Sequence, residues 1–152
     1  MNFTVQKGNI EDTVQFVLFL EAVRAGMPQQ NWFYLDSADD VHSMMADGTM
    51  EFWMAFADKQ LAAVFSILRS GLRSDNYGYD LKLCKEDLLR VIHMDTAAVH
   101  QDYRGFGLQV RLMQMAEREL SGIGNRILLS TVHPENKFSL NNMLRQGYEI
   151  QT

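Results

Sequence analysis

Apolar and polar residues alternate in several short runs that are typical of half-buried strands. In "FTVQKG", near the start, the alternation places Phe3 and Val5 on one face. The runs "TMEFWMAFA" and "LAAVFSILRSG" are separated only by the polar "DKQ", which predicts an antiparallel hairpin. The strands expected from these patterns comprise residues 3–8, 49–57, 61–71, 91–100 and 126–132.

Helical spacing of apolar residues marks four other segments. The first is apolar nearly all round, follows a potential N-cap at Asn9 and stops at Gly26 and Pro28. The last has Pro134 at its start and Gly147 at its end, and "YEIQT" after it resembles the beginning of a further strand. The expected helices comprise residues 10–26, 36–48, 107–121 and 134–147. The predicted order is therefore βααβββαβα with a final partial β, a mixed sheet of the α/β (α+β) class in a single domain, residues 1–152.

Composition narrows the range of functions. The single cysteine, Cys84, excludes an internal disulfide and a cysteine-based zinc site, and the histidines show no metal-ligand spacing. No apolar run approaches the length of a membrane span and no secretory signal is visible, so we expect a cytoplasmic protein without a membrane partner. A formal charge of −5 argues against nucleic-acid binding. Residues 1–100 carry all of the acidic excess and residues 101–152 are nearly neutral. This division suits a cationic substrate in one part and an anionic cofactor in the other, or reflects chance variation of a solvated surface.

A glycine-rich turn precedes the third helix in the stretch "VHQDYRGFGLQVRLMQMAEREL". Glycines before a helix N-terminus let unpaired backbone N–H groups approach an anion. The stretch lacks the Lys-Ser/Thr of a P-loop and the third glycine of a dinucleotide fingerprint. Either an anion site or a simple tight turn accounts for it. Beyond the turn, one face of the predicted helix is apolar and is expected to pack in the core. It carries Leu108, Leu112, Met115, Ala116 and Leu120.

The same stretch resembles the acetyl-coenzyme-A-binding motif of the GNAT acetyltransferases, Arg/Gln-x-x-Gly-x-Gly/Ala between a strand and a helix. Arg104 and Gly107 fill the first two places, while Gln109 stands where a small residue is usual. Downstream, "HPENKFSLNNMLRQGYE" is also similar to the family. The resemblance implies a GNAT fold whose C-terminal hairpin is incomplete, because the chain stops inside the first of two usual strands. An open, apolar sheet edge beside residues 126–132 favours a homodimer.

The resemblance also implies a cofactor site for acetyl-CoA. Backbone amides of the turn would hold the pyrophosphate, and a splayed strand together with an asparagine on the last helix would contact the pantetheine arm. The Gln109 side chain would have to point away. The pyrophosphate residues are Arg104, Gly105, Phe106, Gly107, Leu108 and Gln109, and the pantetheine residues are Ala97, Ala98, Val99 and Asn136.

For catalysis, acetyl transfer needs a base for the amine, donors for the developing oxyanion and a proton for the thiolate. Strand alternation places His93, Asp95, Ala97 and Val99 on one face, and His93 and Asp95 are the candidate bases, unless each only hydrogen-bonds a loop. The amide of Val99 or a neighbour would polarise the carbonyl. Met143 occupies the place of the family's usual tyrosine acid and cannot donate a proton.

The acceptor pocket is expected to use aromatic residues that follow the first helix, Trp32 and Tyr34, and two from the long aperiodic stretch 71–90, Tyr77 and Tyr79. The two loop tyrosines are also the substitute proton donors. Two function classes remain open: an acetyl-CoA-dependent N-acetyltransferase acting on a small-molecule or peptide amine, and a non-catalytic GNAT-fold module that senses acyl-CoA. A purely structural domain without a ligand is a third class. The sequence does not identify the acceptor.

Overall fold

The computed structural model describes residues 1–28, 35–121 and 126–151. Its centre is a five-stranded sheet in the order β1-β2-β3-β4-β5, with antiparallel pairs throughout except for the parallel pair of β4 and β5. The strands are β1 Phe3–Lys7, β2 Met50–Ala57, β3 Gln60–Leu68, β4 Val91–Val99 and β5 Ile127–Leu129. The helices are α1 Thr13–Ala25, α2 Ala38–Ala46, α3 Lys85–Leu88, α4 Leu108–Ser121 and α5 Lys137–Arg145, with short 3-10 turns η1 Ile10–Asp12, η3 Tyr77–Tyr79 and η4 Gln101–Tyr103.

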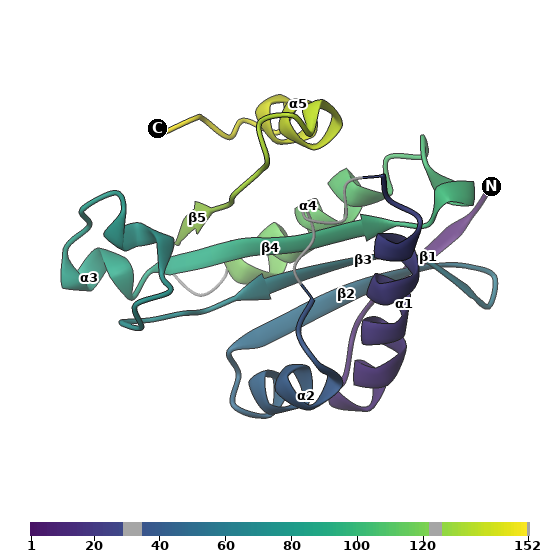
Figure 1. The fold of residues 1–152 in the computed structure, drawn as a ribbon, viewed down its shortest axis with the longest axis horizontal. Coiled ribbons are helices and arrows are strands. Elements are labelled where there is room, and N and C mark those ends of the chain that lie inside the picture. The colour runs from purple at the N-terminus through teal and green to yellow at the C-terminus, as the bar shows by residue number, and fades with distance from the viewer. Residues whose placement is uncertain (29–34, 122–125, 152) are drawn as a thin grey trace.

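Helices cover both faces of the sheet (Figure 1). On one face, α1 and α2 pack their apolar stripes on β2 and β3 through Phe16, Leu20 and Val41. On the other, α4 packs Leu112 and Ala116 against the sheet. The outer side of α1 is exposed to solvent, so only the apolar residues on its inner side are buried. Each face of β2, β3 and β4 is thus buried, which explains their long apolar runs.

The predicted element order is confirmed, with four differences at the C-terminal end and in the long loop. Strand β5 is half-buried and short, whereas a buried strand over 126–132 was expected. Residues 148–151 form no strand, because the Tyr148 hydroxyl donates to Glu117 of α4 at 2.8 Å and ties the segment to that helix. Helix α5 begins at Lys137, after a turn that contains Pro134. The stretch 71–90, expected to be irregular, contains η3 and α3.

A bulge in β4 determines where its side chains point. Ser66 of β3 lies opposite Thr96, but its neighbour Ile67 lies opposite Met94, so Asp95 is an extra residue in β4. Beyond the bulge, Ala97 packs on the α4 side of the sheet. The prediction that His93, Asp95, Ala97 and Val99 share one face is therefore wrong, since a bulge shifts the alternation by one residue.

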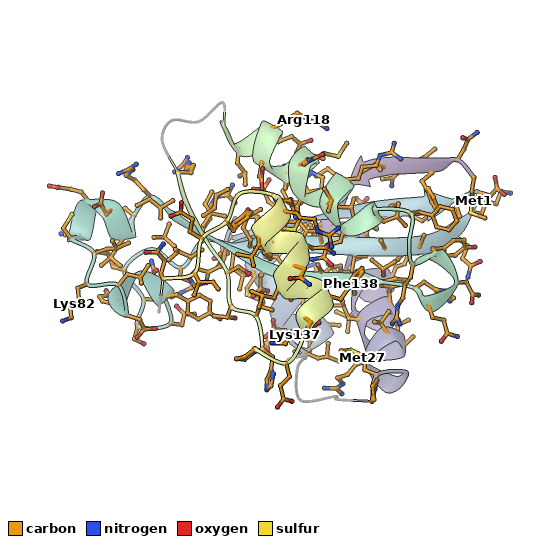
Figure 2. The ribbon with its side chains drawn as sticks, turned by 90° about the horizontal axis from the view of Figure 1, so that it is seen from above. Met1, Met27, Lys82, Arg118, Lys137 and Phe138 are labelled. Atoms are coloured by element: carbon orange, nitrogen blue, oxygen red, sulfur yellow. The ribbon has the colours of Figure 1, made fainter. Side chains whose placement is uncertain are left out.

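Strands β4 and β5 separate soon after they meet. They pair only from Val91 to His93, and the Ser130 hydroxyl then donates to the Met94 carbonyl at 3.0 Å. Beyond this point β4 continues to Val99 with β3 on one edge and, among the described strands, none on the other. Helix α5 lies over this side of the molecule and carries the exposed Phe138 (Figure 2). The separation leaves a row of main-chain groups on β4 open to a ligand.

None of the described helices combines the length and apolar character needed to span a membrane.

Candidate active site

A cavity of about 740 Å³ lies where β4 and β5 separate. Its lining comes from both faces of the sheet, so the cavity passes through the gap between the two strands. One end adjoins α4 and α5, and the other adjoins α2 and the loop 71–90. We call these the helix end and the loop end of the cavity.

The helix end is lined by uncharged side chains. Ala97 of β4, Gln109 of α4 and Asn136, the N-cap of α5, line it together with Met113 and Met143. The side-chain oxygen Oδ1 of Asn136 accepts the Ser139 N–H at 3.4 Å, and the side-chain NH₂ group makes no hydrogen bond within the described residues. The Gln109 side chain makes none there either. This end of the cavity therefore offers unused amide groups and an open strand edge.

Next to the helix end, the glycine turn leads into α4. Gly105 and Gly107 have φ of 86° and 71°, and a side chain at either position would meet no atom within 4 Å. The amides of residues 105–107 donate to no acceptor among the described residues, and the first amides of a helix lack partners by geometry. The Phe106 ring packs edge-on against Phe3 of β1, with centroids 5.4 Å apart, which fixes the turn to the sheet. The turn is thus an exposed set of main-chain donors.

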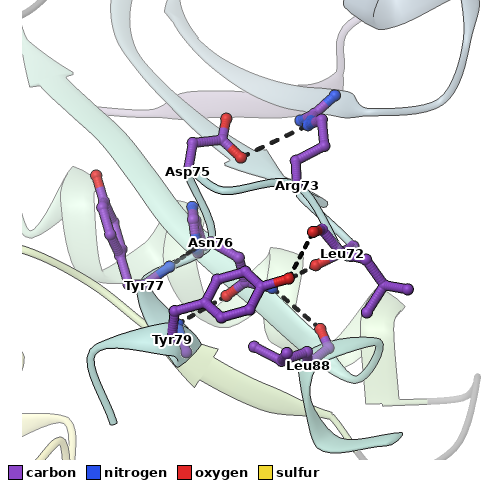
Figure 3. Close-up of polar contacts among 10 residues, drawn as sticks. Leu72, Arg73, Asp75, Asn76, Tyr77, Tyr79 and Leu88 are labelled. Carbon is purple, nitrogen blue, oxygen red and sulfur yellow. Dashed lines mark hydrogen bonds and ion pairs between the residues drawn. The ribbon is translucent and has the colours of Figure 1, made fainter. Parts of the chain in front are cut away.

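At the loop end, Asn76 organises the loop (Figure 3). Its side chain is buried, donates to the carbonyls of Gly71 and Leu88 at 2.8 and 3.1 Å, and accepts the Gly78 N–H at 2.7 Å. A side chain at Gly78 would approach Leu88 to 2.8 Å, so the loop is tightly packed at this point. The loop wall of the cavity therefore has one defined conformation that a single amide side chain supports.

His93 links β4 to this loop. The Tyr77 N–H donates to His93 Nε2 at 3.1 Å, and the two rings stack at 4.1 Å with an interplanar angle of 13°. Because Nε2 accepts, the ring proton of the neutral imidazole lies on Nδ1. Burial lowers the pKa of His93, so the neutral form prevails at pH 7. The lone pair that a general base needs is already occupied.

Asp95, the bulge residue, lines the cavity between its two ends. Burial raises the pKa of its carboxyl to about 6, and the nearby Asp36 contributes in the same direction, while hydrogen bonding from Thr96 opposes them. The Thr96 hydroxyl donates to Asp95 Oδ2 at 3.2 Å. A carboxyl group with a pKa near 6 is ionised at pH 7 but holds a proton far better than an exposed aspartate, as a general base requires.

Further carboxylates line the loop end. Asp36 precedes α2, and burial followed by the charge of Asp40 raises its pKa. Asp75 and Asp80 come from the loop, where Asp75 pairs with Arg73 at 3.5 Å (Figure 3). The loop end is consequently acidic.

The family model described as "Acetyltransferase (GNAT) family" matches residues 24–148. The chain belongs to the GNAT acetyltransferase family. A comparison with curated proteins found no match.

Solved structures of other GNAT proteins share the fold at low sequence identity. The aminoglycoside acetyltransferase AAC(6')-Iy, in complex with the bisubstrate analogue CoA-S-monomethyl-acetylneamine, is 16% identical with a TM-score of 0.75 over 100% of this chain and 94% of that one. The aminoglycoside acetyltransferase meta-AAC0020 from an uncultured soil metagenomic sample is 9% identical with a TM-score of 0.74 over 99% and 91%. yncA, a putative acetyltransferase from Salmonella typhimurium with its cofactor acetyl-CoA, is 12% identical with a TM-score of 0.74 over 100% and 82%. These similarities establish a GNAT fold.

Some of the residues predicted for a GNAT site meet at the cavity. Seven of them line it: His93, Asp95, Ala97, Gln109, Asn136, Tyr77 and Tyr79. The turn from Arg104 to Gly107 directly precedes α4, whose first turn reaches the cavity through Gln109. The side chains of Ala98 and Leu108 are buried in the core, which leaves only their main-chain groups for a ligand. Arg104 and Val99 line a separate small groove beside the end of α1. Trp32 and Tyr34 lie outside the described residues.

Two expectations about side chains change. Gln109 lines the cavity, whereas it was expected to contribute only its main-chain amide to the pyrophosphate site; that its side chain points away from the pyrophosphate stays a prediction. The Tyr79 hydroxyl donates to the Leu72 carbonyl at 2.6 Å and is committed to holding the loop (Figure 3). Sequence reasoning missed the loop-end carboxylates of Asp36, Asp75 and Asp80. The acidic excess of residues 1–100 was the available signal, but it could not say which carboxylates meet.

Among the described residues, no group of three or more His, Cys, Asp and Glu side chains is placed to hold a metal ion.

Proposed function

We propose that this GNAT protein is an acetyl-CoA-dependent N-acetyltransferase that acts on a primary amine. The observation that carries the proposal is the position of Asp95, a half-buried carboxylate with a raised pKa, in a cavity that begins beside the open edge of β4. The solved relatives described with CoA, acetyl-CoA or a CoA-containing analogue support this choice of cofactor, and those named aminoglycoside acetyltransferases support an amine acceptor.

The chain has groups that fit the coenzyme. The free amides of residues 105–107 and the start of α4 would hold the pyrophosphate, since exposed helix N-termini favour anions. The unpaired edge of β4 from Ala97 to Val99 would hydrogen-bond the pantetheine arm as an added strand would, with Asn136 and Gln109 on the opposite wall. Bound acetyl-CoA supplies an acetyl group on a reactive thioester carbonyl.

In the proposed reaction, the acceptor nitrogen forms a bond to the acetyl carbon and the carbon–sulfur bond breaks. Asp95 takes the proton that the amine must lose, directly or through water, because its carboxylate faces the cavity and has a pKa close to the working pH. His93 is not the base in this scheme, since its Nε2 accepts the Tyr77 N–H. The Val99 amide or a neighbour on the same edge would polarise the carbonyl.

Met143 requires a different route for the last proton. It is buried in the cavity wall at the place where the family's tyrosine acid is expected. An alkyl thiol has a pKa of about 8.5, so the thiolate is a good leaving group and water can protonate it. Of the two tyrosines considered as substitutes, Tyr79 already donates to Leu72, whereas the Tyr77 hydroxyl makes no bond within the described residues. A missing tyrosine therefore does not exclude turnover.

Met143 does favour a second candidate, a GNAT module that binds acyl-CoA without transferring the acetyl group. Thiol release from acetyl-CoA in the presence of an amine panel, together with calorimetry using CoA, separates the two. Amine-dependent thiol release supports the enzyme, and tight CoA binding without release supports the module. Absence of any CoA binding contradicts both. Binding can also be detected as stabilisation of the fold, because a ligand at a hundredfold excess over Kd raises the free energy of unfolding by ~2.7 kcal/mol.

Dimerisation through the outer edge of β5 also stays a prediction.

A further inference from the structure

The loop end of the cavity carries more negative charge than one ammonium group needs. Asp36, Asp75, Asp80 and Asp95 line it, and Arg73 is the one lysine or arginine among the described lining residues. Arg73 already pairs with Asp75. We propose that the acceptor is a small polycationic amine, one with at least two ammonium groups. This inference rests on the proposed function and specifies its substrate class.

The chemistry of transfer favours such a substrate. The amine that attacks must first give its proton to Asp95, and a monoamine then has no charge left for the acidic wall to hold. A second ammonium group remains ionised at neutral pH, with a pKa of about 10, and stays beside the carboxylates of Asp36, Asp75 and Asp80. The carboxylates of the loop end therefore hold a polycation throughout the reaction. They hold a monoamine only until it gives up its proton.

The carboxylates also act on one another across segments. Asp36, before α2, raises the pKa of Asp95 on β4, and Asp75, in the loop, acts on His93. Three separate parts of the chain thus direct negative potential into one space. Concave sites lined by one sign of charge concentrate oppositely charged ligands and speed their association.

A second, independent feature points to a polar ligand in the same place. The His93 side chain is only 3% exposed, lines the cavity and has its Nδ1 proton without a partner among the described residues. The Nδ1 atom itself keeps access to solvent, so an oxygen or neutral nitrogen of the acceptor can replace water as its hydrogen-bond partner. The whole cavity, including the helix end proposed for the pantetheine arm, has a volume of about 740 Å³, so the space left for the acceptor fits a small amine.

The test compares thiol release from acetyl-CoA with three linear acceptors of similar length: aminohexanol, hexamethylenediamine and spermidine. We expect kcat/KM to be about tenfold higher for the diamine than for aminohexanol and at least as high for spermidine. The gap should narrow as ionic strength rises from ~0.05 to ~0.5 M, because screening weakens exposed charges. Equal kcat/KM for aminohexanol and the diamine overturns the inference, as does faster turnover of a lysine-rich peptide than of every small amine.

Charge variants give a second, independent readout. Asp80→Asn should lower the diamine-to-aminohexanol ratio of kcat/KM severalfold, and Arg73→Gln should raise it. Asp58→Asn makes the same charge change in the β2–β3 turn, where φ of 53° suits asparagine, and should leave the ratio unchanged. If neither Asp80→Asn nor Arg73→Gln changes the diamine-to-aminohexanol ratio, the carboxylates of the loop end do not hold the second ammonium group, and the inference is contradicted. If no amine releases thiol from acetyl-CoA, the proposed function itself fails, an outcome distinct from turnover without preference for polyamines.

Discussion

At and beside the helix end of the cavity the chain offers main-chain groups and uncharged side chains, and at the loop end it offers charged side chains. The glycine turn and the open edge of β4 present amides and carbonyls that any sequence able to fold this way would supply. The loop end brings together carboxylates from the segment before α2, the loop 71–90 and the β4 bulge. A main-chain site suits a ligand that stays constant. A side-chain site can change with few substitutions, which suits an acceptor that differs among relatives.

The largest expected effect comes from the residue where the two ends meet. Asp95→Asn keeps the size of the side chain but removes the proposed base, so we expect kcat to fall by ~10²–10⁴. Affinity for CoA, measured by calorimetry, should stay within a factor of about two, because the main-chain groups of the helix end do not change. In the unchanged protein, kcat/KM should rise with pH through about 6 as the Asp95 carboxyl ionises.

Two outcomes would count against this division of roles. One is an Asp95→Asn variant that keeps most of its kcat, and the other is a variant that loses CoA affinity together with turnover. His93→Gln serves as the comparison. Glutamine can still accept the Tyr77 N–H, so this variant should keep the same rising limb of the pH profile and change kcat only severalfold.

The second prediction concerns the support of the loop end. Asn76→Ala removes three hydrogen bonds and leaves the buried carbonyl of Leu88 without its side-chain donor. We expect the free energy of unfolding to fall by ~2–3 kcal/mol, measured by urea denaturation. KM for the amine should rise because the loop wall loses its fixed conformation, while the Kd of CoA stays nearly constant. Equal losses of amine and coenzyme affinity would show that the two ends are not independent.

The same contrast explains what the sequence revealed. The element order and the glycine turn were predicted because they depend on local features: apolar period, N-caps and residues such as Gly107 that accept positive φ. The bulge at Asp95 has no such signature, so the predicted shared face of His93 and Ala97 was wrong. The hydrogen bond between His93 and Tyr77 depends on how the loop folds back on β4. The spacing of apolar residues along the sequence gives no information on that folding.

The acidic loop end was hidden for a related reason. Asp36 and Asp95 are far apart in the chain, and only the packing of the segment before α2 against the β4 bulge brings their charges together. The further strand expected to begin in residues 148–152 is absent over residues 148–151, where the contact of Tyr148 with α4 outweighed a short β-like run. In each case a tertiary contact decided the structure over a weak local preference.

A third prediction measures what the acidic end costs in stability. The pKa of Asp95 is about 6 in the folded protein and ~3.9 in an unfolded chain, so the protonated carboxyl favours folding. This contribution is complete below pH ~4 and is lost as pH rises through about 6. Asp95→Asn mimics the neutral form, so it should stabilise the protein by ~1–2 kcal/mol at pH 7.5 and by nearly nothing at pH 4.

Thermal unfolding of both proteins at the two pH values tests this, with an expected increase in Tm of a few degrees for Asp95→Asn at pH 7.5 only. Asp58→Asn, on the exposed hairpin turn, is the matched control and should show no such pH-dependent gain. A stabilisation that is equal at both pH values would mean that the carboxylate charge is not its source.

The smallest effect is expected at the helix end, where a pair of glycine variants separates strain from binding. Gly107→Ala forces a side chain into φ of 71°, and Gly48→Ala does the same at 81° in the α2–β2 turn, with no neighbouring atom within 4 Å in either case. Both should lose a similar ~1 kcal/mol of stability. Only Gly107→Ala should also weaken CoA binding, by about tenfold, because its methyl group lies among the amides proposed to hold the pyrophosphate. Equal CoA affinity in the two variants would place the pyrophosphate away from this turn and leave the open edge of β4 as the main support of the coenzyme.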